Sequence, residues 1–335
     1  MNTRVKASIA AVALGAFFYP RKAEGGEFEG KTVLITGGSR GLGFILARLF
    51  AEEGARIAIC SRSETELRNA ELKLRRWTDH ILTRACDVGD PNQVEAFVQA
   101  AIERFGTIDV VVNNAGVIQV GPLEAMSRED FLDNMEVTFA GTLNVTNAAL
   151  PALERSGGRI MNITSIGGVV AVPHLAPYTA AKHAAVGLSE ALSIELKRRG
   201  VAVTTVVPGL MRTGSYGNAL FKGKMETEYS LFALGASLPL VSMDAERAAM
   251  KMVDACRRRE PYIVIGAPAK VARLLFHLLP GTSLRLLGTL DRLLPGAAPG
   301  DRHKPAERGF DHETALTQSP VTMLAQEAAL KYNER

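Results

Sequence analysis

The sequence has few cysteines, little net charge and no long block of basic residues. Its three cysteines, Cys60, Cys86 and Cys256, are far apart and lack paired spacing. This pattern argues against a disulfide framework or a zinc site and favours a reducing compartment. The formal net charge is only +4, so the composition gives little support to nucleic-acid binding.

The apolar stretch near the N-terminus, Ala7–Tyr19, is too short for a membrane span. Its 13 residues would form a helix about 20 Å long, whereas the hydrocarbon core is about 30 Å thick. The Pro20-Arg21-Lys22 that follows argues against a cleaved secretory signal. We expect residues 1–29 to be a shallow membrane anchor and a linker. The alternative is that the stretch packs on the protein's own surface.

Between residues 30 and 266, β-branched runs alternate with helical patterns. Such alternation is typical of βαβ units around a parallel sheet, and the apolar content of 47% is enough for a full core. The sequence therefore predicts one α/β domain, a Rossmann-type doubly wound sheet with seven parallel strands. The candidate strands are Thr32–Thr36, Arg56–Cys60, Ile81–Ala85, Asp109–Val112, Arg159–Ile163, Val201–Val206 and Tyr262–Ile265.

Three segments fall outside this alternation. Residues 213–241 are rich in leucine and aromatic side chains and are predicted to form a substrate lid, although the same side chains could complete the core or a subunit interface. Residues 267–295 are predicted to form two short basic amphipathic helices, which suit an anionic membrane surface or subunit packing. Residues 296–335 are polar and are expected to be mostly disordered.

A glycine-rich turn opens the first predicted helix. Gly37, Gly41 and Gly43 follow the first strand in the pattern Gly-x-x-x-Gly-x-Gly. Such a turn lets backbone amides approach a pyrophosphate, and the helix N-terminus adds partial positive charge. The glycines could serve chain reversal alone, but the flanking strand and helix favour a dinucleotide site. The turn also contributes Ser39, Arg40 and Leu42 to this predicted site.

Tyr178 and Lys182 form a second pattern, with Ser165 upstream. On the predicted helix Pro177–Arg199, residues four apart share a face, so the ammonium of Lys182 can favour the charged form of the Tyr178 phenol. A phenol with an ordinary pKa of about 10 is a poor base, and such a neighbour would make it a usable proton donor and acceptor. The pair alone is also typical of an ordinary amphipathic helix.

Together with Asn113-Asn114-Ala115-Gly116, these motifs resemble the short-chain dehydrogenase/reductase family from about Gly30 to about Ile265. Each motif is weak alone, but the set is specific. The resemblance implies a carbonyl reductase in which Tyr178 delivers a proton, Ser165 bonds the carbonyl oxygen and Lys182 also bonds the nicotinamide ribose. No metal ion is needed for this chemistry.

The resemblance also assigns cofactor contacts after several strands. The residues implied are Asp87 and Val88 at the adenine, Asn114, Ala115 and Gly116 beside the ribose, Pro208 and Gly209 on the nicotinamide side, and Thr213 at the carboxamide. Asn114 is expected to have a structural role as well.

The end of the second strand, Cys60-Ser61-Arg62, lacks an acidic residue. An acid at this point would bind the ribose hydroxyls and repel a 2′-phosphate. Arg62 and Arg40 instead offer forked donors that suit phosphate oxygens. Each arginine alone could be a solvated surface charge, but the two together favour NADP(H) over NAD(H).

The family's usual asparagine in the predicted helix Arg128–Leu153 is replaced by Thr138. A hydroxyl at this position could hold a water molecule, and Asn134 lies one turn away. Neither replacement is assured, so the predicted catalytic set is Ser165, Tyr178 and Lys182 alone.

These features predict an NADP(H)-dependent oxidoreductase that interconverts a ketone and a secondary alcohol. The apolar lid favours a hydrophobic carbonyl or alcohol, such as a lipid-, retinoid- or steroid-like substrate; family members with membrane-attached ends offer an analogy. The alternative is a nucleotide-binding, membrane-associated scaffold with little turnover. We expect the protein on the cytoplasmic side, with a membrane surface and a homo-oligomer as further partners left open.

Overall fold

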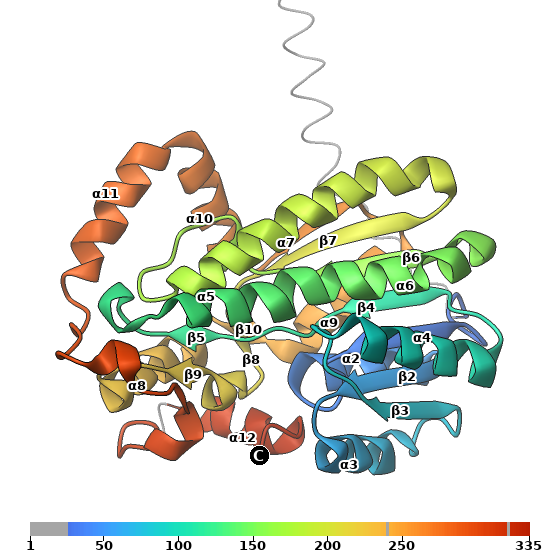
Figure 1. Cartoon of the computed structure of the whole chain (residues 1–335), viewed down its shortest axis with the longest axis horizontal. Coiled ribbons are helices and arrows are strands. Elements are labelled where there is room, and N and C mark those ends of the chain that lie inside the picture. Colours follow the sequence, from blue (N-terminus) through green and yellow to red (C-terminus); the bar gives the residue numbers. More distant parts are fainter. Residues whose placement is uncertain (1–25, 239–240, 320–321) are drawn as a thin grey trace, which may run out of the picture.

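A seven-stranded parallel sheet forms the centre of the protein (Figure 1). The computed structural model describes residues 26–238, 241–319 and 322–335. The sheet has the order β11-β7-β6-β4-β1-β2-β3, and every neighbouring pair is parallel. Its strands are β1 (Thr32–Thr36), β2 (Arg56–Ser61), β3 (Ile81–Ala85), β4 (Val110–Asn113), β6 (Arg159–Ile163), β7 (Ala202–Pro208) and β11 (Tyr262–Ile265). The predicted doubly wound fold is confirmed.

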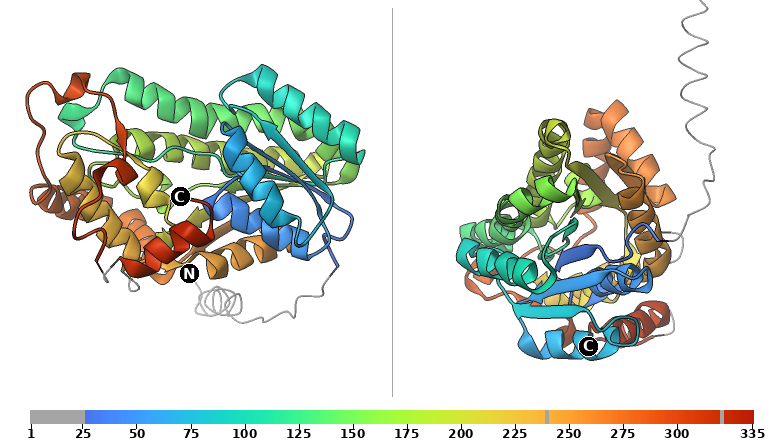
Figure 2. Two further views of the ribbon diagram at one scale, coloured as in Figure 1. Left: turned by 90° about the horizontal axis from the view of Figure 1, so that it is seen from below. Right: turned by 90° about the vertical axis from the view of Figure 1, so that its right-hand side faces the viewer.

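Alternating side chains bury both faces of the sheet. In β1, Val33 and Ile35 join one core cluster whereas Leu34 joins the other, as expected when successive strand residues point to opposite faces. The first cluster packs under α2 (Gly41–Glu52), α3 (Glu64–Leu74) and α9 (Ala245–Arg257). The second packs under α4 (Pro91–Phe105) and α6 (Gly141–Ser156), and α7 (Ala176–Glu195) lies against β7. Figure 2 shows the sheet between these layers.

The predicted long helix Arg128–Leu153 is divided in the structure. It consists of α5 (Arg128–Met135), a π-helical turn (Glu136–Ala140) and α6. A single widened turn leaves the apolar pattern intact on both sides, so periodicity could not reveal it. π-Helical turns are rare in proteins overall, but many of those that occur lie at functional sites. This one contains Thr138.

The lid region packs its aromatic side chains into a third core cluster. Tyr216, Phe221 and Tyr229 are all buried there, so they complete the core, one of the two roles predicted for them. The region contains β9 (Leu220–Phe221) and α8 (Met225–Ser237) and is flanked by β8 (Met211–Arg212) and β10 (Met243–Asp244). β8 pairs with β10, and β9 lies between β5 (Gln119–Val120) and β12 (Glu307–Arg308).

The basic segment after the sheet forms the two helices that the sequence predicts. They are α10 (Ala267–Leu278) and α11 (Pro280–Asp291), and Pro280 begins the second helix, where its missing N–H costs nothing. In the described part of the chain, no helix is both long and apolar enough to cross a bilayer. The expected anchor, within residues 1–25, lies outside the described residues.

The C-terminal segment 296–335 differs from the expected disordered tail. It contains β12 and α12 (Met323–Lys331), and Ala325 and Ala329 are completely buried. A Cβ on Gly214 would lie 2.4 Å from the Cα of Ala329, so small side chains allow α12 to pack closely on the lid. In Figure 2 this red segment runs back beside α2. Its weak apolar pattern hid the packing because alanine and glycine supply close contact with little hydrophobicity.

Candidate active site

The glycine turn after β1 has the conformation that a phosphate-binding turn requires. Gly37 and Gly41 have φ angles of 62° and 53°, which glycine adopts without strain. A Cβ on Gly43 would lie only 2.1 Å from the carbonyl oxygen of Gly37. In the described chain, the amides of Leu42 and Gly43 have no acceptor. The turn therefore offers free donors at the start of α2 and fits a dinucleotide phosphate.

Asn114 fixes this turn against the end of β4. Its Nδ2 donates to the carbonyl oxygens of Thr36 and Gly37, each at 3.0 Å. The Thr36 hydroxyl in turn accepts from the amides of Asn114 and Ala115, each at 3.0 Å. These four bonds support the expected structural role of Asn114 and couple the phosphate turn to the neighbouring strand.

β6 and α7 bring together Ser165, Tyr178 and Lys182. Ser165 follows β6 directly, and its Oγ accepts a bond of 3.1 Å from the amide of Gly167. The Nζ of Lys182 donates to the carbonyl oxygen of Ile163, the last residue of β6, at 3.0 Å. It lies 5.8 Å from the centre of the Tyr178 ring. The three predicted catalytic side chains therefore share one site.

Burial controls the protonation of the two ionisable groups in this site. It raises the pKa of Tyr178, and the nearby Ser165 hydroxyl only partly opposes the rise. It also lowers the pKa of Lys182 to about 8, because a low-dielectric environment disfavours the ammonium. The lowering of the Tyr178 pKa that the sequence predicts from Lys182 remains a prediction. Burial thus favours the neutral form of the Tyr178 phenol.

Gly167 and Gly168 allow the loop after β6 to approach α7, a requirement that the sequence analysis missed. A Cβ on Gly167 would lie 3.0 Å from Cε1 of Tyr178, and one on Gly168 would lie 2.7 Å from the carbonyl oxygen of Lys182. Glycine at both positions thus keeps the serine beside the tyrosine. In the sequence, the only sign of this close approach is the Gly-Gly pair that follows Ser165.

Thr138 lies beside the lysine. A Cβ on Gly116 would be 3.4 Å from Nζ of Lys182 and 3.7 Å from Oγ1 of Thr138. The Thr138 hydroxyl is buried and has no hydrogen-bond partner in the described chain. Asn134 is bonded elsewhere, to Gln119 and to the carbonyl oxygen of Asp130. The Oδ1 of Asn134 also has no partner in the described chain, so both side chains considered for a water-holding role keep one free oxygen.

The two predicted phosphate-binding arginines have different surroundings. Nη1 of Arg40 lies 3.1 Å from Oε1 of Glu66 and 3.0 Å from Oδ1 of Asn218. The other Glu66 oxygen accepts from the Ser39 hydroxyl at 2.9 Å. Arg62, next to the half-buried Ser61, is exposed. Arg40 is therefore held within the protein, whereas Arg62 faces solvent.

The remaining predicted cofactor residues follow the strand ends but make local contacts. The carboxylate of Asp87 accepts from the amide of Gly89 at 3.0 Å, and Val88 is buried in the core. Thr213 is also buried, and its hydroxyl bonds that of Ser215 at 2.8 Å. Pro208 ends β7, and the amide of Gly209 donates to Ile265 at 2.9 Å. Their predicted cofactor contacts remain predictions.

The last residues of the chain also reach the glycine turn, a contact that no motif in the sequence predicts. The carbonyl oxygen of Tyr332 accepts from the amide of Gly41 at 2.7 Å. Glu334 is 7% exposed, and its Oε2 lies 3.5 Å from Nε of Arg40. Burial raises the pKa of Glu334 to about 7 although Arg40 opposes the rise. A polar tail without a motif carries no sequence signal for such a contact.

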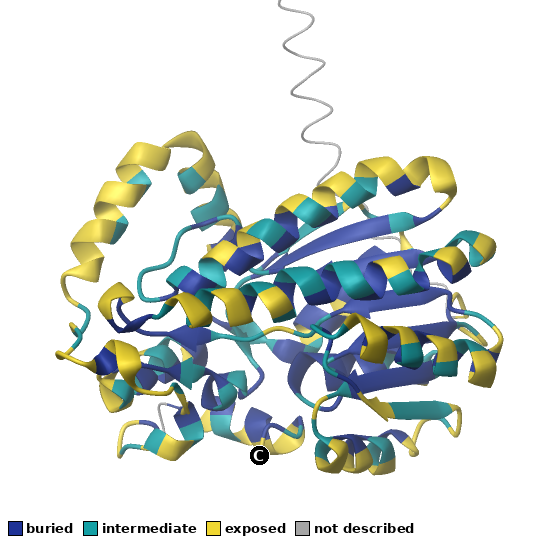
Figure 3. Ribbon diagram, in the orientation of Figure 1, coloured by how far each residue is buried: buried dark blue, intermediate teal, exposed yellow. Residues whose placement is uncertain are grey.

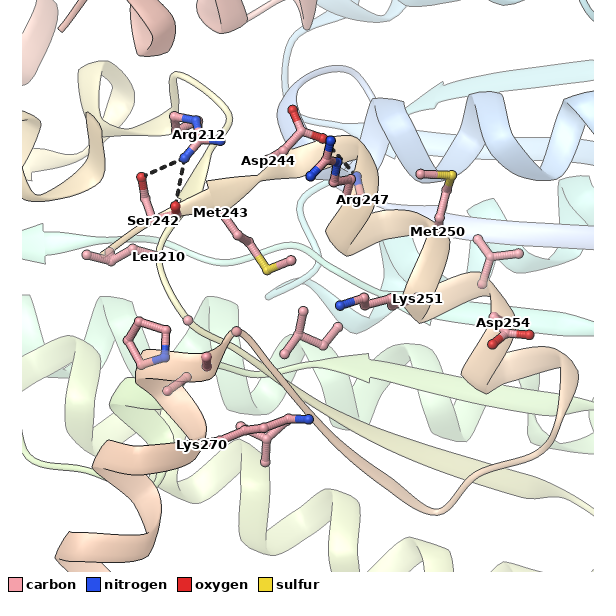
Figure 4. A pocket seen from close by; sticks show the side chains of 18 of the residues that line it. Leu210, Arg212, Ser242, Met243, Asp244, Arg247, Met250, Lys251, Asp254 and Lys270 are labelled. Carbon is pink, nitrogen blue, oxygen red and sulfur yellow. Dashed lines mark hydrogen bonds between the residues drawn. The ribbon is translucent and has the colours of Figure 1, made fainter. Parts of the chain in front are cut away.

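A separate cavity of about 1070 Å³ lies between α9, α10 and the end of β11. Figure 4 shows Met243 at its centre, Lys251 on α9 and Lys270 on α10. Gly209 also lines it, but Ser165, Tyr178 and Lys182 do not. This cavity therefore lies behind the nicotinamide-side turn and is not where the predicted chemistry would occur.

Known proteins share this architecture. The model of the short chain dehydrogenase family matches residues 31–220. A putative ketoacyl reductase of Streptomyces coelicolor is 41% identical over 188 residues, 55% of this chain and 72% of that protein. An L-fucose dehydrogenase of Oryctolagus cuniculus is 37% identical over 188 residues, 56% of this chain and 65% of that protein. A crystal structure of an actinorhodin polyketide ketoreductase with NADPH matches 72% of this chain and 97% of its own, with a TM-score of 0.63 and 32% identity.

The close approach at Gly43 gives a test of the phosphate turn. Gly43→Ala places a methyl group against the Gly37 carbonyl, so we expect the Kd for NADP⁺ to rise by about tenfold or more. Gly187→Ala on α7 is the control, because a Cβ there meets no atom within 4 Å. Calorimetric titration of both variants measures the effect. Equal Kd values would show that the turn does not bind the cofactor.

Proposed function

Because the chain belongs to the short-chain dehydrogenase/reductase family, we propose that it is an NADP(H)-dependent reductase of lipophilic ketones. The oxidoreductase class and the Rossmann-type fold follow from the family. The observation that carries the finer assignment is the convergence of Ser165, the neutral Tyr178 and the buried Lys182 beside the end of β6.

Each of the three side chains has a role that its surroundings support. Hydride addition places negative charge on a carbonyl oxygen, and the Ser165 hydroxyl can donate a hydrogen bond to that oxygen. Tyr178 delivers the proton, because its raised pKa keeps the phenol protonated at neutral pH. Lys182 stays protonated below about pH 8 and stabilises the tyrosinate left after the proton has gone. The bound cofactor supplies the hydride.

The cofactor preference rests on the arginines and on a missing acid. The exposed Arg62 is free to pair with a 2′-phosphate, and Ser61 beside it cannot repel one. A ketoreductase of similar fold was crystallised with NADPH. These observations support NADP(H) as the working cofactor of this chain.

The surroundings of Tyr178 support a hydrophobic substrate. Tyr178 packs against the third core cluster together with four partly buried apolar side chains, Ile118, Val172, Met225 and Phe232. A substrate carbonyl that reaches the Tyr178 hydroxyl therefore approaches apolar groups, which favour a lipid-like or similar carbon skeleton. These four side chains pack against the same cluster as Phe221 and Tyr229, which are buried.

Replacing Tyr178 tests the reaction and its alternative, a scaffold with little turnover. Tyr178→Phe removes the proton donor, so we expect kcat to fall by about 10²–10⁴-fold while NADPH binding is unchanged. Steady-state NADPH oxidation with ketones of graded chain length measures the loss, with Tyr262→Phe on the edge strand β11 as the control. Retained turnover would reject the proton-donor role. Absence of turnover in the unmodified protein would favour the scaffold.

Arg62 provides the test of cofactor preference. Arg62→Asp replaces a phosphate-binding charge by a ribose-binding acid, so we expect the ratio of kcat/KM for NADPH over NADH to fall by about 10–100-fold. Arg84→Asp, an exposed arginine of the neighbouring strand β3, controls for the change in net charge. An unchanged ratio in Arg62→Asp would contradict the assignment.

The α10–α11 hairpin supports attachment to a membrane surface. Figure 3 shows it as the most exposed helical part of the protein, and α11 has no buried residue. Leu274, Leu278 and Leu286 are each more than half exposed, and cations line the same segment, including Lys270 and Arg285. Exposed leucines beside basic side chains suit the headgroup region of an anionic bilayer.

Vesicle binding tests this attachment. We expect Leu278→Gln combined with Leu286→Gln to weaken binding to vesicles of phosphatidylglycerol and phosphatidylcholine by about tenfold or more. Leu72→Gln on α3, which is 68% exposed, is the control. Cosedimentation measures the bound fraction. Unchanged binding would remove the hairpin from the membrane contact, and an altered elution volume in gel filtration would favour subunit packing.

A further inference from the structure

The C-terminal residues contact two of the groups predicted to bind the cofactor phosphates, the Gly41 amide and the Arg40 guanidinium. The Gly41 amide, at the start of α2, is bonded to the carbonyl oxygen of Tyr332. A Cβ on Gly41 would lie 2.2 Å from Oε1 of Glu334, so this carboxylate rests directly on the glycine turn. The side chain of Asn333 also donates to the Ser39 carbonyl oxygen at 3.2 Å. Three consecutive tail residues thus cover one turn.

Arg40 is neutralised by this arrangement. It contacts Glu66 from α3 on one side and Glu334 from the tail on the other. The Nδ2 of Asn218 donates to the backbone and side-chain oxygens of Glu334, each at 2.8 Å. The carboxylate of Glu334 therefore has the partners that an anionic phosphate would use, namely a guanidinium and an amide donor.

The tail is held in place by packing further from the turn. Tyr332 is buried within the core cluster that contains α2 and α9, and Lys331 pairs with Glu246 of α9 at 3.0 Å. The open space of about 290 Å³ beside Arg40 is lined by the tail residues Asn333, Glu334 and Arg335. A dinucleotide and the docked tail cannot both use this turn.

We propose that residues 332–335 are a built-in competitor of the cofactor, in which Tyr332 and Glu334 occupy the phosphate-binding groups and must leave before NADP(H) binds. The inference rests on the cofactor assignment made above. Glu334 is central to this competition, because its carboxylate competes with phosphate for Arg40 and repels an incoming phosphate at close range. Cofactor affinity is reduced by the fraction of molecules in which the tail is docked.

Binding of NADP⁺ to the full-length protein tests this competition without any reaction. Calorimetry should give a Kd about tenfold lower for a chain that ends at Lys331, as expected if the tail leaves one molecule in ten competent. Glu334→Gln should lower the Kd less, since the amide removes the charge but keeps the shape. Glu327→Gln, which changes an exposed carboxylate of the preceding helix α12, should leave the Kd unchanged. Because Glu334→Gln retains Tyr332, it keeps the test valid if the shortened chain folds poorly.

Hydrogen–deuterium exchange provides an independent readout. Saturating NADP⁺ should increase exchange at residues 329–335, because the cofactor displaces them. Greater protection there, or weaker NADP⁺ binding by the shortened chain, would show that the tail clamps the cofactor and would overturn the proposal. Equal Kd values for all variants would also overturn it. Failure of every variant and of the unmodified protein to bind NADP⁺ would instead refute the cofactor assignment, and the competition with it.

Discussion

Burial of the parallel sheet on both faces is the constraint on which the rest of the molecule depends. Because helices must cover each face, every strand is followed by a crossover that returns the chain to the same end of the sheet. The turn after β1, the end of β4 and Ser165 after β6 therefore meet at one edge. Parallel pairing of β1 with β4 and of β4 with β6 fixes their spacing, and the bonds of Asn114 add local rigidity.

At this edge of the sheet, ionisable side chains are buried away from water. The cost of burying a charge shifts their pKa values. Lys182 is buried and its ammonium is balanced by the Ile163 carbonyl, while burial keeps Tyr178 protonated. A buried charge without a partner would be expensive, so the end of β6 stabilises the lysine at the same time as it presents the serine. The π-helical turn adds the unpartnered hydroxyl of Thr138 beside this lysine.

The C-terminal segment connects both ends of the site. Its helix α12 packs on the Gly214 loop, next to Thr213 in the chain, and its final residues lie on the glycine turn. The family match covers residues 31–220, so the segment lies outside the matched part of the chain. The N–H groups of a phosphate-binding turn have no acceptor until a phosphate binds. The acidic residues of the tail can accept hydrogen bonds from them.

The sequence by itself determined the sheet, the glycine turn and the proximity of Ser165, Tyr178 and Lys182, because these depend on local periodicity and on spacings that a helix or a strand converts directly into geometry. The strands agree with the predicted ranges within a few residues. Only the tertiary structure decided what surrounds these groups. The bond of Lys182 to Ile163 and the contact of Glu334 with Arg40 join residues that are distant in sequence. The widened turn at Thr138 depends on one inserted residue. Burial and long-range packing create them, and neither leaves a local pattern.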